Sequence, residues 1–374
     1  MGAFNVIGGG ILGAATAYEL ARQGAKVTLI DRADRGQATA AAAGIICPWV
    51  SQRRNQVWYR LAKAGARYYP ELIAQLRQEG EADTGYAQVG ALSLRAESPA
   101  LDRLQERAEL RSADAPEMGE LTRLDARAVR EQFPLLAEGY QAVRIGGAAR
   151  VDGRALRDAL IRSAVRHGAE LVYGSAALRV RGKRVVGADA DGRPIAADAT
   201  LVCAGAWARE LLMPLGIGLQ VGYQKAQIMH LQLEDAPDTG RWPVIMPPTD
   251  QYLLAFAHGR IVIGATHENE VEGYDTRPTA GGMQELLHKG LQVAPGLTGA
   301  AFAEMRVGLR PFTPGFLPVA GAVPGWSGLY AANGLGSSGL TVGPFLGSQL
   351  ARLALGRATV SLSDYSLGQV IDLV

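Results

Sequence analysis

The chain has 374 residues, of which 48% are hydrophobic and 20% charged, a composition typical of a globular protein with room for two domains. Its formal net charge is +2, which gives no reason to expect nucleic acid or an anionic membrane surface as a partner. The two cysteines, Cys47 and Cys203, stand far apart and predict neither a disulfide framework nor a metal site. No signal peptide is evident, and no apolar run reaches the roughly 18 residues of a spanning helix. We therefore expect a cytoplasmic protein, with peripheral attachment to a membrane left open.

The first thirty residues predict a strand, a glycine-rich turn, a helix and a second strand. The two strands are Ala3–Ile7 and Lys26–Ile30, and the helix between them is Ala14–Gln23, closed by Gly24. This order is a βαβ unit, which builds parallel sheets.

The rest of the chain alternates helices with short strands. In chain order we expect a helix at Gln56–Glu79, a strand at Val89–Arg95, helices at Leu101–Arg111 and Asp125–Gln132, extended segments at Ala142–Ile145 and Ala149–Val151, a helix from a cap at Asp152 to Arg166, several strands between Leu171 and Cys203, strands at Val221–Leu233, Tyr252–Phe256 and Arg260–Ala265, a helix at Gly282–Leu291, strands at Ala303–Arg310 and Leu329–Ala332, and a helix at Ser338–Leu355.

The strands crowd into the middle of the chain, and βαβ-type sequence flanks them on both sides. The fold class that this predicts is α/β, a Rossmann-like dinucleotide-binding domain with an inserted antiparallel-sheet substrate domain. Residues 1–83, 142–217 and 303–374 would form the discontinuous nucleotide domain, and residues 84–141 and 218–302 the substrate domain.

The run Gly8-x-Gly10-x-x-Gly13 lies between the first strand and the first helix. The first glycine permits the tight turn, the second lets the backbone approach a pyrophosphate, and the third lets helix and strand pack closely. Asp31 ends the second strand, where a carboxylate accepts hydrogen bonds from ribose hydroxyls and disfavours a 2′-phosphate. The plain alternative is a glycine-rich turn between core elements.

A second glycine-rich constellation lies near the C-terminus. The segment Gly308–Pro314 ends a strand, and Tyr330–Leu340 forms another strand-to-helix turn crowded with glycines. A helix N-terminus there suits an anion, and a helix cap is the alternative. A nicotinamide-dependent reductase has no evident need for this closing element, although that class stays open.

The sequence resembles the family of glycine oxidase, D-amino-acid oxidase, D-amino-acid dehydrogenase and sarcosine oxidase over nearly its whole length. The resemblance is carried by the fingerprint with Asp31, the small residues Ala38–Gly44, Val151–Leu156 (the family's V-D-P-x-x-L), Leu201–Trp207 (a strand with A-x-G-A-W), Lys225-Ala226-Gln227 (K-G-Q) and Gly308–Pro314 (G-L-R-P-x-T-P).

The resemblance implies FAD as the cofactor. The residues expected to bind it are Gly8, Gly10, Ile11, Leu12, Gly13, Asp31, Arg32, Thr39, Ala43, Gly44, Ala204, Gly205, Trp207, Gly334, Gly336, Ser337, Ser338, Gly339 and Leu340. Sarcosine-oxidase-like members attach flavin through a cysteine just before the T-P stretch, where this chain has none, so we expect non-covalent FAD. The chain also departs from the family at Gly315, where members commonly carry Asp, and at Ala226, where they carry Gly. Some members have His or Arg in the last glycine turn, where this chain has Asn333 and Ser337.

The resemblance assigns Arg310 to the carboxylate of a substrate, since a guanidinium fork grips a carboxylate bidentately. The alternative is a structural arginine paired with a core acid. Tyr252 would donate to the same carboxylate or close the pocket, with Gln251 and Met246 nearby, or would be a half-buried strand tyrosine. Phe256 stands where the family often has Arg.

Several other residues have a plain interpretation. His258 and His267 lie at strand ends and are expected to be solvated loop histidines, because hydride transfer from a neutral amine needs no strong base. The aromatic residues Trp49, Trp58, Tyr59 and Tyr68 are expected to be helical core rather than pocket entrance.

We therefore expect an FAD-dependent oxidoreductase that oxidises the C–N bond of a small amino acid (glycine, a D-amino acid, a proline-type or an N-methyl amino acid) to an imine, which water hydrolyses. Oxygen, a quinone or a carrier protein would accept the electrons. The alternative is a flavin-carrying subunit of a hetero-oligomeric amine dehydrogenase that needs a partner. A homo-oligomer is left open.

Overall fold

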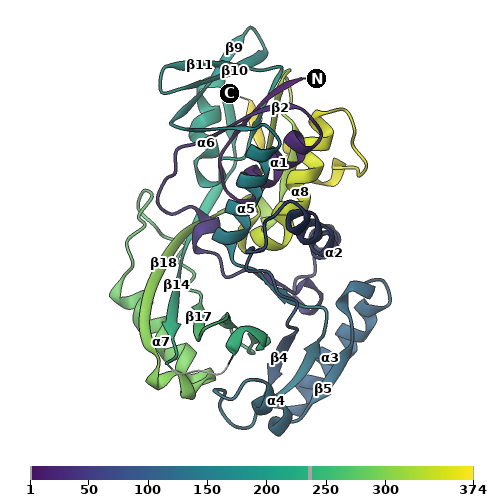
Figure 1. Ribbon diagram of the computed structural model, residues 1–374, viewed down its shortest axis with the longest axis vertical. Helices are drawn as coiled ribbons and strands as arrows, with labels where there is room; N and C mark the ends of the chain where they lie inside the picture. The colour runs from purple at the N-terminus through teal and green to yellow at the C-terminus, as the bar shows by residue number, and fades with distance from the viewer. Residues whose placement is uncertain (1, 235–237, 374) are drawn as a thin grey trace.

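The structure is a computed structural model that describes residues 2–234 and 238–373. Its helices are α1 Ile11–Arg22, α2 Gln56–Gln78, α3 Ser98–Ser112, α4 Ala126–Gln132, α5 Gly153–Arg166, α6 Ala208–Leu212, α7 Ala280–Val293 and α8 Gly339–Ala354. Figure 1 shows α1, α5 and α8 side by side in the upper half of the molecule and α7, α3 and α4 in the lower half.

A mostly parallel six-stranded sheet forms the centre of the upper half. Its strands, in spatial order, are β19 Val319–Ala322, β20 Leu329–Asn333, β12 Ala199–Val202, β1 Ala3–Ile7, β2 Lys26–Asp31 and β8 Glu170–Tyr173. All neighbours pair in parallel except β19 and β20. The strands β1 and β2 are almost wholly buried apolar runs, as expected for a parallel sheet covered on both faces.

Two layers cover this sheet. One is the packed helices α1, α5 and α8. The other is the three-stranded antiparallel sheet β9 Ala176–Arg181, β10 Arg184–Ala190 and β11 Arg193–Ala196, whose Ala188 and Ala190 pack against Ile7 and Ile30. Smaller two-stranded pairings are β3 Ile45–Ile46 with β7 Ala149–Arg150, and β13 Ile217–Leu219 with β21 Ile371–Leu373.

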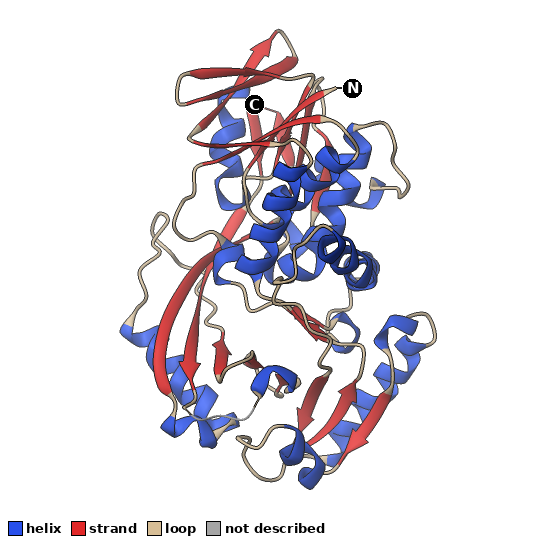
Figure 2. Cartoon of the chain, in the orientation of Figure 1, coloured by secondary structure: helices blue, strands red, loops and turns tan. Residues whose placement is uncertain are grey.

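An eight-stranded sheet forms the lower half. Its spatial order is β18 Ala301–Phe312, β14 Gly222–Gln232, β17 Arg260–Gly264, β16 Tyr252–Ala255, β15 Val244–Met246, β4 Ala91–Arg95, β6 Gln141–Ile145 and β5 Leu121–Leu124. The sheet is antiparallel except for the parallel pair β15 and β4. Figure 2 shows the long strands β14 and β18 reaching from this sheet up to the helical layer.

Both sheets have their own core. Met229, Leu231, Ile261 and Ile263 of the eight-stranded sheet pack on Leu286 of α7. The opposite face of that sheet joins the large core that contains α1, α2 and α8. The expected α/β fold class, with a Rossmann-like part and an antiparallel sheet, is therefore confirmed.

The predicted division into domains stays a prediction, but the sheets bear on its boundaries. The boundary between residues 141 and 142 falls inside β6, and that between residues 302 and 303 falls inside β18. Both strands belong to the eight-stranded sheet.

Candidate active site

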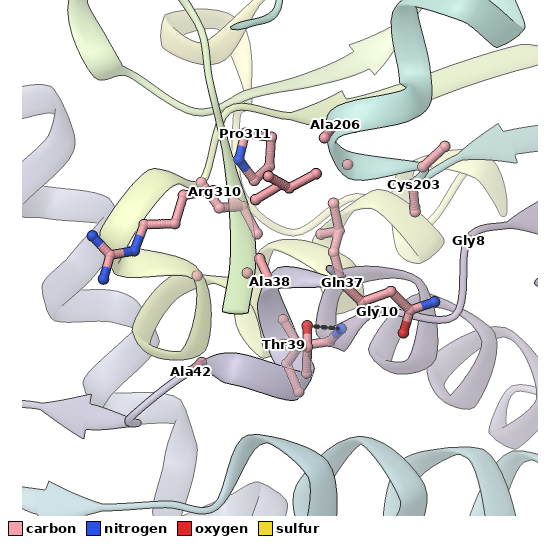
Figure 3. Close-up of a pocket in the computed structure, with 18 of the residues that line it drawn as sticks. Gly8, Gly10, Gln37, Ala38, Thr39, Ala42, Cys203, Ala206, Arg310 and Pro311 are labelled. Atoms are coloured by element: carbon pink, nitrogen blue, oxygen red, sulfur yellow. Dashed lines mark hydrogen bonds between the residues drawn. The ribbon is translucent and has the colours of Figure 1, made fainter. Parts of the chain in front are cut away.

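A cavity of about 510 Å³ lies where the two large sheets meet. In Figure 3, Gly8 and Gly10 lie at one side of it, Arg310 at the other, and Ala38 and Thr39 between them. Because these residues come from β1, the following turn, the loop after β2 and β18, only the folded chain brings them together.

Most of the predicted cofactor residues line this cavity. They are Gly8, Gly10, Ile11, Leu12, Asp31, Arg32, Thr39, Ala43, Gly44, Ala204, Gly205, Trp207, Gly336, Ser337, Gly339 and Leu340. Gly13, Gly334 and Ser338 do not belong to the lining.

These three residues support the wall from behind. A Cβ atom on Gly13 would lie 1.8 Å from the carbonyl oxygen of Gly8, so only glycine lets α1 approach the end of β1 this closely. Gly334 has a φ of +77°, and a Cβ atom there would lie 2.5 Å from Thr313 Oγ1. Ser338 accepts a hydrogen bond from the indole of Trp58 at 3.1 Å.

The carboxylate of Asp31 is held at the cavity edge. The side-chain amide of Gln37 donates to both of its oxygens, at 3.1 and 3.0 Å. A Cβ atom on Gly9 would lie 2.6 Å from the Oδ2 atom of Asp31, so a side chain at position 9 would displace the carboxylate. This carboxylate is available to accept from hydroxyl groups of a ligand lying over the turn.

A slot lined by small residues, among them Thr39, Ala41 and Gly308, forms the middle of the cavity. Thr39 fixes it to α1, because its hydroxyl accepts from the backbone N–H of Ile11 at 2.9 Å, the bond dashed in Figure 3. Gly308 of β18 packs so closely on it that an added Cβ atom would lie 2.9 Å from Ala41 Cβ. Larger side chains on either wall would close the space that a planar ring needs.

Arg310 and Tyr252 both line the cavity at the far side from the fingerprint glycines. Arg310 Nη1 donates a long hydrogen bond of 3.4 Å to the side-chain oxygen of Gln224 on β14. Among the described residues, no carboxylate oxygen lies within 4.0 Å of the Arg310 guanidinium. Burial raises the pKa of Tyr252, and the neighbouring Arg310 partly opposes this rise, so the phenol stays a neutral donor. Within the described residues, Arg310 is therefore not paired with a core acid, which was the structural alternative for this residue.

Comparison with known proteins identifies the family. A model of FAD-dependent oxidoreductases matches residues 5–353. The chain belongs to this family.

Relatives and solved structures agree over nearly the full length. The chain is 59% identical to an uncharacterized oxidoreductase, YurR, of Bacillus subtilis, with 98% of both chains covered. It is 32% identical to a glycine oxidase of Pseudomonas aeruginosa, with 95% of both covered. The structure of an iminodiacetate oxidase from Chelativorans sp. BNC1 superposes with a TM-score of 0.94 at 46% identity, covering 97% of this chain and 98% of the other. The oxidoreductase is therefore an FAD-dependent enzyme, as the sequence predicts.

The residues of this oxidoreductase fit FAD. The turn has no room for side chains at Gly8, Gly9 and Gly13, and the carboxylate of Asp31 is placed to accept from ribose hydroxyls. The small-residue slot lies between the turn and Arg310. The two halves of an FAD molecule, a dinucleotide with a flat ring at one end, need these features in this order.

Two cavity residues were missed or misjudged from the sequence. His267 lies directly after β17 and Asp250 before β16, and both line the cavity beside Tyr252. His267 is an exposed loop histidine, as expected, with a side chain that is 40% exposed, but it also lines the cavity. The usable signal was the antiparallel pairing of the two predicted strands, which brings the residues at their ends together.

The remaining candidates lie outside the cavity lining. His258 is exposed in a turn, as expected. Gln251, which was expected near Tyr252, is buried and donates to the carbonyl oxygen of Ala265 at 3.2 Å, and neither Gln251 nor Met246 belongs to the cavity lining.

The aromatic residues around α2 are structural. Trp49, Trp58 and Tyr59 are buried in the large core, and Tyr68 packs against it. None of these four residues belongs to the cavity lining. Phe256 is also buried, between the guanidinium groups of Arg150 and Arg260, at 4.4 and 4.0 Å from its ring centroid. The preferred interpretation of the aromatic patch is therefore confirmed.

Within the described ranges, no three His, Cys, Asp or Glu side chains group as metal ligands would. None of the described helices is long and apolar enough to cross a membrane.

Proposed function

We propose that this oxidoreductase oxidises the C–N bond of a small amino acid whose carboxylate binds Arg310 and Tyr252. The observation that carries this proposal is the placement of an arginine without a carboxylate partner in the same cavity as the FAD-type glycine turn. A substrate carboxylate would complete the bidentate pairing of its guanidinium and so fix the adjacent carbon over the small-residue slot.

In the proposed reaction, residues of the chain orient the substrate and favour the uncharged form of its amino group. Arg310 and Tyr252 hold one carboxylate, and the apolar walls around Ala43 and Leu309 exclude water. Exclusion of water favours the uncharged amine, from which a hydride can leave without a strong protein base. When bound, FAD supplies the acceptor for that hydride.

The proposed reaction converts the amine to an imine with loss of two electrons and two protons, and water then hydrolyses the imine to an oxo acid and ammonia or an amine. We propose oxygen as the electron acceptor, which becomes hydrogen peroxide. The names of two similar proteins, a glycine oxidase and an iminodiacetate oxidase, support this choice over a quinone or a carrier protein. They also make glycine, its N-substituted derivatives and iminodiacetate the first substrates to test.

We propose that FAD is held without a covalent bond. Cys203 lines the cavity beside the glycine turn, and burial raises the pKa of its thiol to about 12. A thiol of this pKa is a poor nucleophile at neutral pH. Acid precipitation of the purified protein should therefore leave the yellow flavin in the supernatant; a yellow pellet would contradict non-covalent binding.

The experiment that tests the function is anaerobic titration of the purified protein, followed by its visible spectrum. We expect the flavin absorbance to bleach with at least one of glycine, sarcosine, proline, iminodiacetate and a set of D-amino acids. Readmission of air should restore the colour and release peroxide. A yellow protein that none of these compounds bleaches would sink the proposal and favour a flavin-carrying subunit that needs a partner. Bleaching without reoxidation by air would point to a dehydrogenase.

A further inference from the structure

Beyond the carboxylate site at Arg310, a second polar group enters the cavity, formed by His267 with Asp250. His267 follows β17 and Asp250 precedes β16, and the Nδ1 and Oδ2 atoms of the two side chains lie 3.9 Å apart. Both line the cavity that contains Arg310 and Tyr252. Because both residues line this cavity, they would surround the part of the substrate that lies beyond its first carboxylate.

The Asp250 carboxylate forms an ion pair with a lysine. Lys289 of α7 donates to both of its oxygens, at 3.2 and 3.0 Å, and also to Glu285 at 2.8 Å. Burial alone would raise the pKa of Asp250, but the hydrogen bond and the charge of Lys289 hold it below its ordinary value. Asp250 is therefore a fixed anion, and Lys289 balances its charge only in part because the lysine also pairs with Glu285.

His267 is the group left for a ligand. Among the described residues no hydrogen bond to its ring is found, and the carboxylate within 4.0 Å of the ring is that of Asp250. Burial lowers its pKa, the charge of Arg310 lowers it further, Lys289 adds to this, and Asp250 and Glu285 oppose the shift. A second anion in the cavity would oppose the effect of burial on this pKa, because it would pair with the charged ring. The first carboxylate would oppose the effect of Arg310, because it would neutralise the guanidinium.

The sheet sets the spacing between the two groups. Arg310 lies on β18, and β14 separates that strand from β17, after which His267 follows. Two strand spacings place the backbones about 10 Å apart. The Arg310 guanidinium lies close enough for its charge to lower the pKa of His267 and to oppose the rise in the pKa of Tyr252 on β16. A ligand with one carboxylate at Arg310 therefore has its other end close to His267.

We propose that protonated His267 binds the second carboxylate of a dicarboxylic secondary amine, so that the site selects amino acids carrying an N-carboxyalkyl group. This inference rests on the proposed function for the position of the first carboxylate. Asp250 acts as a positioning residue, since it favours the charged form of the ring, and Lys289 positions Asp250.

The test uses the yellow holoenzyme and unreactive ligands that perturb its flavin spectrum. Glutarate has the shape of iminodiacetate with a methylene group in place of the nitrogen, and butyrate lacks the second carboxylate. We expect glutarate to bind on the order of tenfold more tightly than butyrate at about pH 6.5, as one charge-assisted hydrogen bond provides. Because glutarate binding takes up a proton at His267, this preference should fall as the pH rises to about 8.5.

The matched variants are His267→Gln and His288→Gln. His288 is an exposed histidine on α7 that stands outside the cavity lining. We expect the preference for glutarate, and its pH dependence, to disappear in H267Q and to persist in H288Q. With reactive amines, the ratio of kcat/KM for iminodiacetate to that for sarcosine should fall by a similar factor in H267Q.

Three outcomes would overturn the inference. They are equal affinities for glutarate and butyrate, an unchanged preference in H267Q, and tighter binding of 4-aminobutyrate than of glutarate, which would mean that Asp250 attracts a cation. If instead no amine bleaches the flavin while glutarate still binds through His267, the proposed function fails and the dicarboxylate site stands.

Discussion

Arg310 shows how one side chain decides the orientation of a whole substrate. Its guanidinium lies in the cavity with a tyrosine hydroxyl and the Gln224 amide around it, and no carboxylate of the described residues reaches it. A charged group held in this way is stabilised when a ligand supplies the missing anion. Arg310 and the small-residue slot line the same cavity, so in the proposed function binding of the carboxylate also positions the neighbouring carbon.

Replacing Arg310 with Ala should raise KM for carboxylate substrates about 100-fold, the effect of losing a charge-assisted bidentate pair. Arg310→Lys should raise KM by an intermediate factor, since lysine keeps the positive charge but cannot form the bidentate pair. Steady-state kinetics would measure both, and the flavin spectrum should be unchanged. Arg241→Ala, which removes a side chain that is 91% exposed, is the control. Unchanged kinetics in R310A would refute the assignment.

The residues at the site differ in how far their role can be predicted from the residues next to them in the sequence. The fingerprint glycines and Asp31 are predictable because strand, turn and helix are adjacent in the sequence, and the closest contact of Gly13 is with Gly8 inside this unit. His267 could be predicted as a cavity residue only from the pairing of β16 with β17, and not from its own neighbours in the sequence. Its neighbour Asp250 belongs to another strand end, and its environment depends on α7 and β18, which lie beyond any sequence window.

At the scale of elements, the long strands and helices were predicted, together with short strands such as β16, but β5, β15 and β19 were not. The predicted range Val221–Leu233 contains β14, and the predicted helix Gln56–Glu79 ends one residue beyond α2. The strands β5, β15 and β19 have three or four residues, too few for an alternating pattern to show. Pairing with neighbours that are distant in sequence makes them strands.

Glu19 connects two helices that are far apart in the chain. It lies on α1, with a side chain only 1% exposed, and it accepts hydrogen bonds from Arg22 at 2.8 Å and from Arg352 of α8 at 2.9 Å. Burial would raise its pKa, but the two arginines outweigh this and lower it below the ordinary value. A carboxyl whose pKa is lower in the folded state stabilises that state above its unfolded pKa of about 4.3 and ceases to do so as the pH falls through the folded pKa.

Glu19→Gln should therefore lower the free energy of unfolding by about 2 kcal/mol at neutral pH, because two partly buried arginines lose their anion. The difference from the unaltered protein should shrink below about pH 4, where Glu19 itself takes up a proton. Urea denaturation at several pH values would measure it. Glu131→Gln breaks an exposed pair on α4 and should cost less than about 0.5 kcal/mol. Equal effects of both variants would mean that the α1–α8 connection contributes nothing special.

At the scale of the whole molecule, the cavity is the place where distant parts of the chain meet. Its lining comes from residues before 46, from the segment around Cys203, from β16 and β18, and from the turn before α8. The two large sheets contact the same cavity from opposite sides, and the long β18 bonds directly to the loop after β2, where Leu309 donates to Gly36 at 2.9 Å. A ligand that fills this cavity therefore bridges both sheets, and its binding is coupled to the stability of the entire fold.

Removal of FAD should consequently destabilise the whole protein rather than one loop. A ligand present at about 100 times its Kd stabilises the folded state by about 2.7 kcal/mol, which corresponds to a rise in Tm of about 5 °C for a chain of this size. Thermal unfolding of the apoprotein with increasing FAD would measure this rise, which should continue with the logarithm of FAD concentration. Riboflavin is the control, because it lacks the part that Asp31 and the glycine turn of α1 are placed to bind, and it should raise Tm less. Were FAD and riboflavin to raise Tm equally, the turn and Asp31 would contribute no binding energy, and the fit of the dinucleotide to this end of the cavity would be wrong.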